Sequence, residues 1–258
     1  MNVLRQRLKN KERIYGSIVS LTDPALCEIM GNAGFDCVWI DTEHTYMSYK
    51  EVLCHLNAAR STGIPAVVRL PQDDLTATKR ILEMGPDGII FPMVRSADEM
   101  KSLLDMTLYP PLGSRGFGPL RAIGYGALDA KEYVKKTNLE MLRFVQIEHV
   151  ALIDALENVV NEPCVDGFIF GPNDLSLSLG KLFDLNDALT MSKIKEATKV
   201  IRSAGKTVAL ACGPSLRAIE FWSEFEFDML FAGADWEYVY TMGKATFENM
   251  KNQKGEKL

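Results

Sequence analysis

Short apolar runs recur along the chain, and most of them contain no polar alternation. Eight such runs cover residues 16–21, 37–40, 66–69, 88–91, 143–147, 167–170, 207–210 and 229–232. A run that is apolar at consecutive positions is typical of a parallel strand buried on both faces. The pattern therefore predicts eight short parallel strands.

Helix signals separate these runs. They comprise Pro24 after Asp23, possible capping boxes at Ser48/Glu51 and Ser96/Glu99, a cap at Asp73 or Asp74, and a helix end at Gly205. Strands that alternate with helices in this way predict a (β/α)8 TIM barrel, formed as a single domain over residues 1–258. A doubly wound open sheet is the alternative, which the lack of a GxGxxG or Walker loop after the first run disfavours.

One segment interrupts the alternation. Residues 109–125 are rich in proline and glycine and are longer than a routine connector. We expect a functional loop or lid here, and a surface insertion is the alternative.

Composition and charge narrow the classes of partner. The net charge of -5 argues against nucleic acid and provides no basic patch for a membrane surface. No apolar run approaches the length of a membrane span, and the basic residues 1–13 lack the apolar core of a secretory signal. Five scattered cysteines without CxxC spacing indicate reduced thiols, so we expect a cytoplasmic protein.

The richest candidate chemistry follows the second run. Asp41, Glu43 and His44 lie together where that strand is expected to end and a loop to begin. Strand-end loops carry the chemistry of α/β barrels. Arg69, Gln146, Glu148 and Asp174 also lie at or just past the ends of runs. These side chains are therefore expected at one barrel mouth.

Two of these carboxylates could hold a hard cation. Gln146 and Glu148 are two positions apart on one strand, so their side chains point the same way. Glu148 and Asp174 follow neighbouring strands, and paired carboxylates favour Mg²⁺ or Mn²⁺ over zinc. Asp174 could instead cap the helix that begins after it, and Arg69 could be a structural ion-pair partner rather than an oxyanion ligand.

The three histidines differ in their surroundings. His55 is expected in mid-helix, and His149 adjoins Glu148 without any further signal. Only His44 lies within an acidic strand-end cluster, where a neighbouring carboxylate would orient the ring and raise its basicity. His44 is therefore the candidate general base.

Six short motifs, in this order, resemble the HpcH/HpaI family of class II, metal-dependent pyruvate aldolases. They are Ile-Asp-Thr-Glu-His at 40–44, Val-Val-Arg at 67–69, Phe-Pro-Met-Val at 91–94, Tyr-Pro-Pro at 109–111 followed by Arg115-Gly116, Val-Gln-Ile-Glu at 145–148, and Gly-Pro-Asn-Asp-Leu-Ser at 171–176. Together they span nearly the whole chain. The resemblance implies a barrel of the phosphoenolpyruvate/pyruvate-binding type.

The resemblance also implies roles for the site residues. Glu148 and Asp174 would hold Mg²⁺, Mn²⁺ or Co²⁺, with Gln146 lining the substrate site. Backbone amides near Asn173 and Asp174 would receive the carboxylate of pyruvate, and Arg69 would steady the enolate oxygen. His44, oriented by Asp41, would act with a metal-bound water as the base on the 4-hydroxyl.

Assembly is implied as well. A carboxylate from a neighbouring subunit approaches the histidine in this family, and Glu83 occupies the matching position where aspartate is usual. The resemblance implies a homohexamer in which a C-terminal helix is exchanged between subunits.

The expected reaction is cleavage of a 4-hydroxy-2-oxo acid to pyruvate and an aldehyde. Oxaloacetate decarboxylation, CoA-ester cleavage and a non-catalytic barrel are the alternatives. His44 argues against the CoA lyases of the family, which carry an acidic residue there. Lysine is absent from the carboxyl ends of the eight runs, and Lys206 begins the seventh run, so a Schiff-base aldolase is disfavoured.

Overall fold

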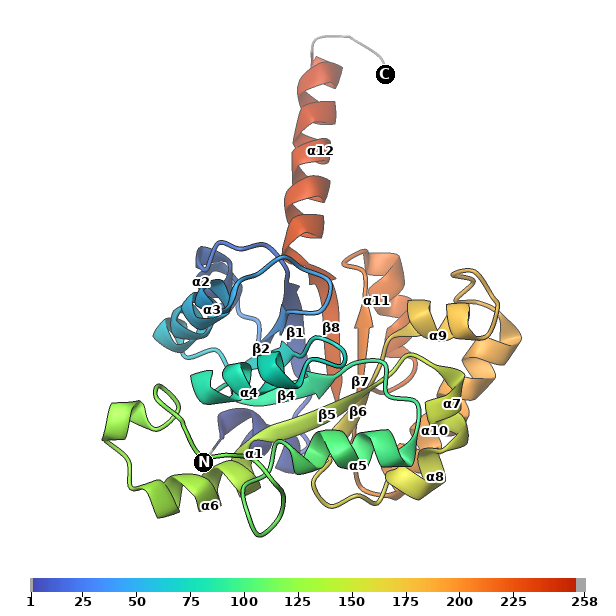
Figure 1. Ribbon diagram of the computed structural model, residues 1–258. Helices are drawn as coiled ribbons and strands as arrows, with labels where there is room; N and C mark the ends of the chain where they lie inside the picture. Colours follow the sequence, from blue (N-terminus) through green and yellow to red (C-terminus); the bar gives the residue numbers. More distant parts are fainter. Residues whose placement is uncertain (1, 254–258) are drawn as a thin grey trace.

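Eight parallel strands close into a barrel in the computed structural model, which describes residues 2–253 (Figure 1). Each strand pairs with the next along the chain, and the last pairs with the first. The strands are β1 (Ile14–Val19), β2 (Cys37–Asp41), β3 (Ala66–Arg69), β4 (Gly88–Phe91), β5 (Leu142–Ile147), β6 (Gly167–Phe170), β7 (Thr207–Cys212) and β8 (Met229–Ala234). The predicted (β/α)8 barrel is confirmed, and the open sheet is excluded.

The strand boundaries agree closely with the apolar runs. β3, β4 and β6 match the predicted ranges, and β7 and β8 each continue two residues further. The first run was placed two residues too late, because β1 begins at Ile14 and ends at Val19. The amides of Ser20 and Leu21 instead donate to the carboxylate of Asp235, beyond the end of β8.

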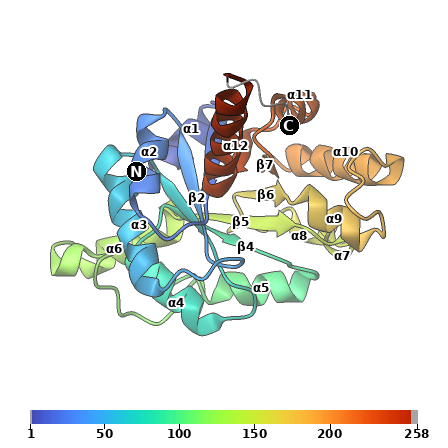
Figure 2. The same ribbon diagram turned by 90° about the horizontal axis from the view of Figure 1, so that it is seen from above.

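Helices surround the barrel (Figure 2). They are α1 (Val3–Lys9), α2 (Ala25–Asn32), α3 (Tyr49–Thr62), α4 (Leu75–Met84), α5 (Ala97–Asp105), η1 (Gly124–Gly126), α6 (Ala130–Glu140), α7 (Val150–Asp154), α8 (Leu156–Val159), α9 (Pro172–Ser178), α10 (Ala188–Ser203), α11 (Leu216–Ser223) and α12 (Asp235–Gln253). The capping box of Ser48 and Glu51 is present, and Asp74 caps α4.

The buried core has two layers. Trp39, Phe144 and Phe231 lie among the residues that fill the barrel interior. A larger apolar cluster packs the outer faces of the strands against the helices. All five cysteines are free thiols. Among residues 2–253, no helix is both long and apolar enough to cross a bilayer.

The proline- and glycine-rich segment lies at the amino-terminal end of the barrel. It follows α5 and docks on the end of α4, where the amide of Ala122 donates to the carbonyl of Glu83 at 3.2 Å. Figure 1 shows the neighbouring α6 far from the base of α12, which marks the mouth. The segment therefore cannot be a lid over the mouth of its own chain, because a segment that follows a helix lies at the opposite end of the barrel. A functional role for this loop stays a prediction.

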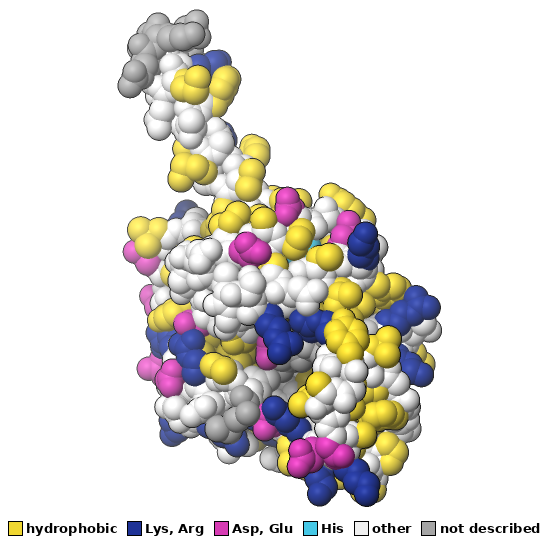
Figure 3. All heavy atoms as spheres, turned by 90° about the vertical axis from the view of Figure 1, so that its left-hand side faces the viewer, with side chains coloured by type: hydrophobic (Ala, Val, Ile, Leu, Met, Phe, Trp, Pro, Cys, Tyr) yellow, Lys and Arg dark blue, Asp and Glu magenta, His cyan; other side chains and the backbone are white. Residues whose placement is uncertain are grey.

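The final helix leaves the barrel. α12 begins directly after β8 and extends outward from the mouth (Figure 1). Figure 3 shows it standing clear of the body, with hydrophobic side chains along its length. Exposed apolar residues on it include Val239, Tyr240, Met242, Phe247 and Met250.

Candidate active site

The carboxyl ends of neighbouring strands bring the predicted side chains together. Asp41 and Arg69 are register partners at the ends of β2 and β3. Glu148 follows β5 directly, and Gly171 follows β6 at the start of α9. The parallel barrel therefore gathers these groups at one mouth, as predicted.

Arg69 is held by a two-pronged contact with Asp41. Its Nε donates to Oδ1 at 2.9 Å, and its Nη2 donates to Oδ2 at 2.6 Å. The guanidinium also lies over the ring of Trp39, 5.1 Å from the centroid. Burial alone would raise the pKa of Asp41, but the bonds and charge of Arg69 outweigh it and lower that pKa. Asp41 is thus ionised and fixes the orientation of Arg69.

The remaining donor edge of Arg69 faces two other carboxylates. Its Nη1 lies 3.2 Å from Glu43 Oε2 and 3.8 Å from Glu148 Oε1. All three side chains are almost entirely buried. One edge of the Arg69 guanidinium is thus bound to Asp41, and the other edge faces the mouth. A guanidinium held in this way is suited to stabilise an oxyanion that develops during a reaction.

His44 lies at the rim with its side chain 64 % exposed. Its Nε2 is 3.7 Å from Glu43 Oε2, whereas Asp41 accepts from the backbone amide of His44. The structure thus places Asp41 on Arg69 and turns Glu43 toward the imidazole, which differs from the expectation that Asp41 orients the ring. No role was assigned to Glu43 from sequence, although its place between Asp41 and His44 was a signal.

Glu148 is buried and fixed from two sides. Gln146 Nε2 donates to Oε1 at 2.6 Å, and the amide of Met93 donates to Oε2 at 3.1 Å. Met93 adopts φ 52°, a left-handed conformation that is uncommon for a side chain of this kind. A Cβ added to Gly171 would lie 2.7 Å from Glu148 Cγ, so glycine is required for this close approach.

Two carboxyl groups at the mouth, those of Glu43 and Glu148, have a raised pKa. Burial raises the pKa of Glu148 to about 7, and the charges of Glu43 and Asp174 add to the increase against the opposing effect of Arg69. Burial also raises the pKa of Glu43, where Asp41 and Asp174 add to it. Negative charges that oppose one another in a buried site favour a bound cation.

The residues fit the implied metal. The donors are carboxylate oxygens, which suit Mg²⁺ or Mn²⁺. Gln146 Oε1 is buried and accepts no hydrogen bond from residues 2–253, so this oxygen is available to a ligand. The described chain contains no cluster of three or more His, Cys, Asp or Glu that could hold a metal. Glu148 and Asp174 would thus be the protein ligands, with other positions left to substrate and water.

Asn173 and Asp174 lie in the first turn of α9. Asp174 is half-buried there, and Asn173 is exposed. The first amides of a helix have no partner within the helix, so they can receive an anionic group.

A cavity of about 550 Å³ opens at this mouth. Asp41, His44, Arg69 and Asn173 line it, and Leu21, Cys212, Trp222, Trp236 and Glu237 form another part of its wall. Gln146 and Glu148 are buried at the carboxyl end of β5. The contribution of β7, β8 and α12 to this wall was not predicted.

Glu83 lies at the other end of the molecule. It belongs to the last turn of α4, which runs opposite to the strands, so it cannot approach His44 of the same chain. Its Oε1 lies 3.6 Å from Arg115 Nη2, and Arg115 stacks 4.4 Å above the ring of Tyr109. Neither carboxylate oxygen of Glu83 has a hydrogen bond within the described residues.

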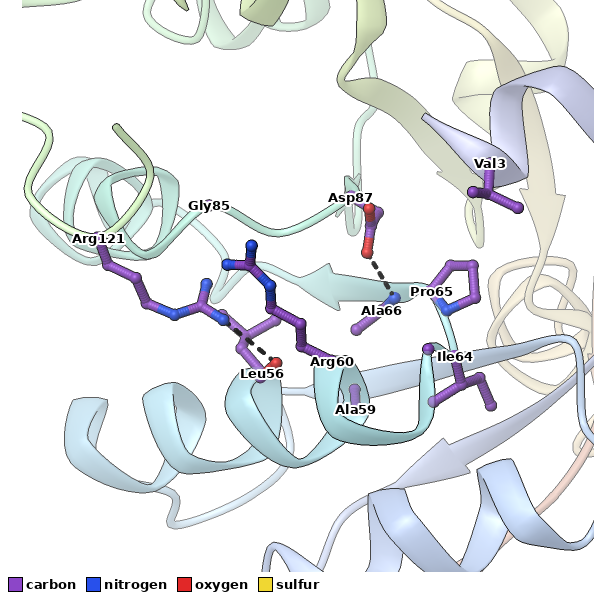
Figure 4. A pocket seen from close by; sticks show the side chains of 11 residues that line it. Val3, Leu56, Ala59, Arg60, Ile64, Pro65, Ala66, Gly85, Asp87 and Arg121 are labelled. Carbon is purple, nitrogen blue, oxygen red and sulfur yellow. Dashed lines mark hydrogen bonds between the residues drawn. The ribbon is translucent and has the colours of Figure 1, made fainter. Parts of the chain in front are cut away.

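A second cavity of about 290 Å³ lies near Glu83, at the amino-terminal end of the barrel (Figure 4). Two of its polar side chains, those of Arg121 and Asp87, form hydrogen bonds within the fold. Arg121 donates to the carbonyls of Leu56 and Met84, and Asp87 accepts from the amide of Ala66. The bonds of Arg121 connect the loop of residues 109–125 to α3 and α4. The candidate catalytic side chains lie at the opposite end of the barrel, at the mouth.

Comparison with known proteins bears on the family of the chain. The sequence model of the HpcH/HpaI aldolase/citrate lyase family matches residues 15–217. A hydroxypyruvate/pyruvate aldolase from Roseovarius nubinhibens is 32% identical over 209 residues, which are 81% of either chain. A 2-keto-3-deoxy-L-rhamnonate aldolase from Escherichia coli is 29% identical over 218 residues, which cover 83% of this chain and 81% of the relative.

A solved structure shares the fold over nearly the full length. The HpcH/HpaI aldolase from Desulfitobacterium hafniense has a TM-score of 0.89 and 26% identity, with 96% of both chains covered. The family match spans β1 to the start of α11 and includes each predicted residue of the mouth. The chain therefore belongs to the HpcH/HpaI aldolase/citrate lyase family.

Proposed function

We propose that this protein is a metal-dependent class II aldolase that cleaves 4-hydroxy-2-oxo acids to pyruvate and an aldehyde. The observation that carries the proposal is the buried carboxylate of Glu148, 3.8 Å from Nη1 of Arg69. Pyruvate aldol chemistry passes through an enolate, and Glu148 as a cation ligand would lie beside a fixed guanidinium. Such an arrangement favours the transition state over the substrate.

Glu148 and Asp174 would hold the divalent cation, Mg²⁺, Mn²⁺ or Co²⁺. When bound there, the cation would act as a Lewis acid that polarises the 2-oxo group. The amide oxygen of Gln146 would face the same site. The first-turn amides of Asn173 and Asp174 would receive the carboxylate of the 2-oxo acid.

The protein residues would divide the remaining work. His44 takes the proton of the 4-hydroxyl, the bond between C3 and C4 breaks, and C4 leaves as the aldehyde. The electron pair of that bond enters the enolate, whose oxygen faces the Nη1 edge of Arg69. Protonation of C3 then gives pyruvate. Glu43, 3.7 Å from His44, stabilises the imidazolium that forms.

Chelation of the metal tests this proposal. A 4-hydroxy-2-oxo acid is incubated with the enzyme, and pyruvate release is followed by a coupled assay. Activity should disappear with EDTA and return with Mg²⁺ or Mn²⁺ in the wild type but not in Glu148→Gln. Glu157→Gln removes the same charge at an exposed position of α8 and serves as the matched control. Full activity of Glu148→Gln after exhaustive chelation contradicts the proposal.

We also propose a homo-oligomer, with a hexamer as the expected size. The exposed apolar side chains of α12 support this, because monomeric proteins seldom expose such a surface. A mostly apolar cavity of about 440 Å³, lined by Tyr15, Phe35, Trp222 and Phe227 among others, lies beside the root of α12. A helix from another subunit would cover such a surface.

Light scattering after size-exclusion chromatography measures the assembly. The full chain should elute as an oligomer, and Tyr240→Asp with Phe247→Asp should shift the mass downward. Both positions are exposed on α12, so the change leaves the barrel core intact. A monomeric wild type that keeps full activity at high dilution contradicts this assignment.

A further inference from the structure

One part of the mouth cavity carries a single carboxylate on an otherwise apolar wall. This part is formed by β7, β8, α11, the start of α12 and the segments around Leu21 and Leu185. Its apolar members include Leu21, Leu185, Ala218, Trp222 and Trp236, and its carboxylate is that of Glu237. The mechanism proposed above makes no use of Glu237.

The fold fixes the position of this carboxylate. Glu237 Oε2 accepts from the amide of Ala234 at 2.8 Å, in the turn that joins β8 to α12. A Cβ added to Gly213, at the end of β7, would lie 3.8 Å from the other oxygen, Oε1. Oε1 therefore lies beside Gly213, and both residues line the cavity.

The charge of Glu237 is not neutralised by the protein. Within residues 2–253, it forms no ion pair with a lysine, arginine or histidine. Burial raises the pKa of Cys212 to about 11, and the charge of Glu237 adds to that increase. The negative charge is thus felt along this side of the cavity.

The same cavity offers few positive charges to a second acidic group. Its basic lining residues, within the described chain, are Arg69 and His44. Arg69 is held by Asp41 and faces Glu43 and Glu148. A carboxylate on the aldehyde would meet Glu237 without a compensating guanidinium or ammonium group, which disfavours binding.

We propose that Glu237 selects the aldehyde partner by accepting a hydrogen bond from the hydroxyl of an uncharged, hydroxylated aldehyde and by repelling aldehydes that carry a carboxylate. The proposal rests on the aldolase function above and names the class of its second substrate. In the direction of synthesis, pyruvate loses a methyl proton to solvent, and its C3 forms the new bond to the aldehyde carbon. The aldehyde oxygen takes a proton from His44 and becomes the 4-hydroxyl.

Three aldehydes of similar chain length test the selection. Aldol addition of pyruvate to D-glyceraldehyde, butanal and succinic semialdehyde is measured as kcat/KM in the full-length enzyme with Mg²⁺ or Mn²⁺. The variant is Glu237→Gln, which retains an oxygen acceptor for the amide of Ala234. Glu224→Gln is the control, because it removes one negative charge at an exposed position outside the cavity.

The wild type should prefer glyceraldehyde to butanal and should use succinic semialdehyde least. Glu237→Gln should reduce the preference for glyceraldehyde over butanal about tenfold, the size expected for a hydrogen bond to a charged group. It should raise the use of succinic semialdehyde relative to butanal, and Glu224→Gln should change neither ratio. Unchanged ratios in Glu237→Gln overturn the selection.

Deuterium exchange into the methyl group of pyruvate, without aldehyde, separates this proposal from the function on which it rests. Exchange in the wild type together with unchanged aldehyde ratios in Glu237→Gln overturns the role of Glu237 alone. An absence of exchange with every metal tested overturns the aldolase function, and the selection with it.

Discussion

Replacement of Glu148 by glutamine should stabilise the metal-free protein at alkaline pH while it abolishes metal binding. Burial raises the pKa of Glu148 from 4.5 to about 7. A carboxyl whose pKa is raised by folding favours the folded state when protonated, and this advantage is lost as pH rises from about 4.5 through 7. Above pH 7 the ionised carboxylate therefore lowers the stability of the metal-free wild type.

The size of this change in stability follows from the increase in the pKa of Glu148. The increase from 4.5 to about 7 corresponds to roughly 3 kcal/mol of destabilisation by the ionised form. Glutamine removes this cost and keeps an acceptor for either Gln146 or Met93 but not for both, which forfeits about 1 kcal/mol. The net gain of about 2 kcal/mol corresponds to a rise in Tm of about 4–8 °C.

Thermal unfolding in EDTA at pH 5 and pH 8 measures this effect. Glu148→Gln should have the higher Tm at pH 8 and should lose that advantage at pH 5. Added Mn²⁺ should raise the Tm of the wild type but not of the variant. Glu157→Gln, exposed on α8, should follow the wild type. A Glu148→Gln variant that unfolds at lower temperature than the metal-free wild type at pH 8 would refute the reasoning.

Three further predictions concern the rest of the site. Asp41→Asn should lower the free energy of unfolding in urea by about 2–3 kcal/mol, because Arg69 loses the carboxylate that binds it with two oxygens and keeps only Glu43, at 3.2 Å. An unchanged urea midpoint contradicts this. His44→Ala should slow retro-aldol cleavage about 10²–10⁴-fold and oxaloacetate decarboxylation much less, since decarboxylation needs no base at a 4-hydroxyl; equal losses would assign His44 another role. Borohydride with pyruvate should leave no adduct on any lysine in the mass spectrum, whereas a pyruvyl-lysine would indicate Schiff-base chemistry.

The positions of the strand ends could be predicted from sequence, because each strand corresponds to a short run of consecutive apolar residues. Uninterrupted apolar runs give parallel strands, and their carboxyl ends must meet at one mouth. Arg69, Gln146 and Glu148 stand at those ends, so their convergence followed from the order of the runs. The side-chain direction of Gln146 and Glu148 followed from the period of two.

Loop conformation was beyond this reasoning. The carboxylate of Asp41 accepts from the amides of Glu43 and His44, and this turn directs Glu43 inward and His44 to the rim. Such a turn depends on which partner Asp41 takes in three dimensions. The sequence contains Asp41, Glu43 and His44 but does not say which carboxylate meets the imidazole.

The sequence limits the prediction of the long loop, residues 109–125, and of the last helix, α12, in different ways. Residues 109–125 follow a helix, so their place at the amino-terminal end could have been deduced from the alternation itself. The departure of α12 from the barrel could not be deduced from periodicity, because apolar positions on a helix do not reveal whether its own barrel or another chain covers them. For this reason the sequence did not predict that Glu237, at the start of α12, lines the cavity.

Deuterium exchange at the methyl group of pyruvate tests the central claim most directly. The claim is that Glu148, Asp174 and Arg69 stabilise a pyruvate enolate with a divalent cation, and exchange reports that enolate without any aldehyde. Proton NMR in D₂O should show metal-dependent loss of the methyl signal in the wild type, with loss of exchange in EDTA and in Glu148→Gln. Exchange that persists after exhaustive chelation, or that never occurs with Mg²⁺, Mn²⁺ or Co²⁺, would contradict the account.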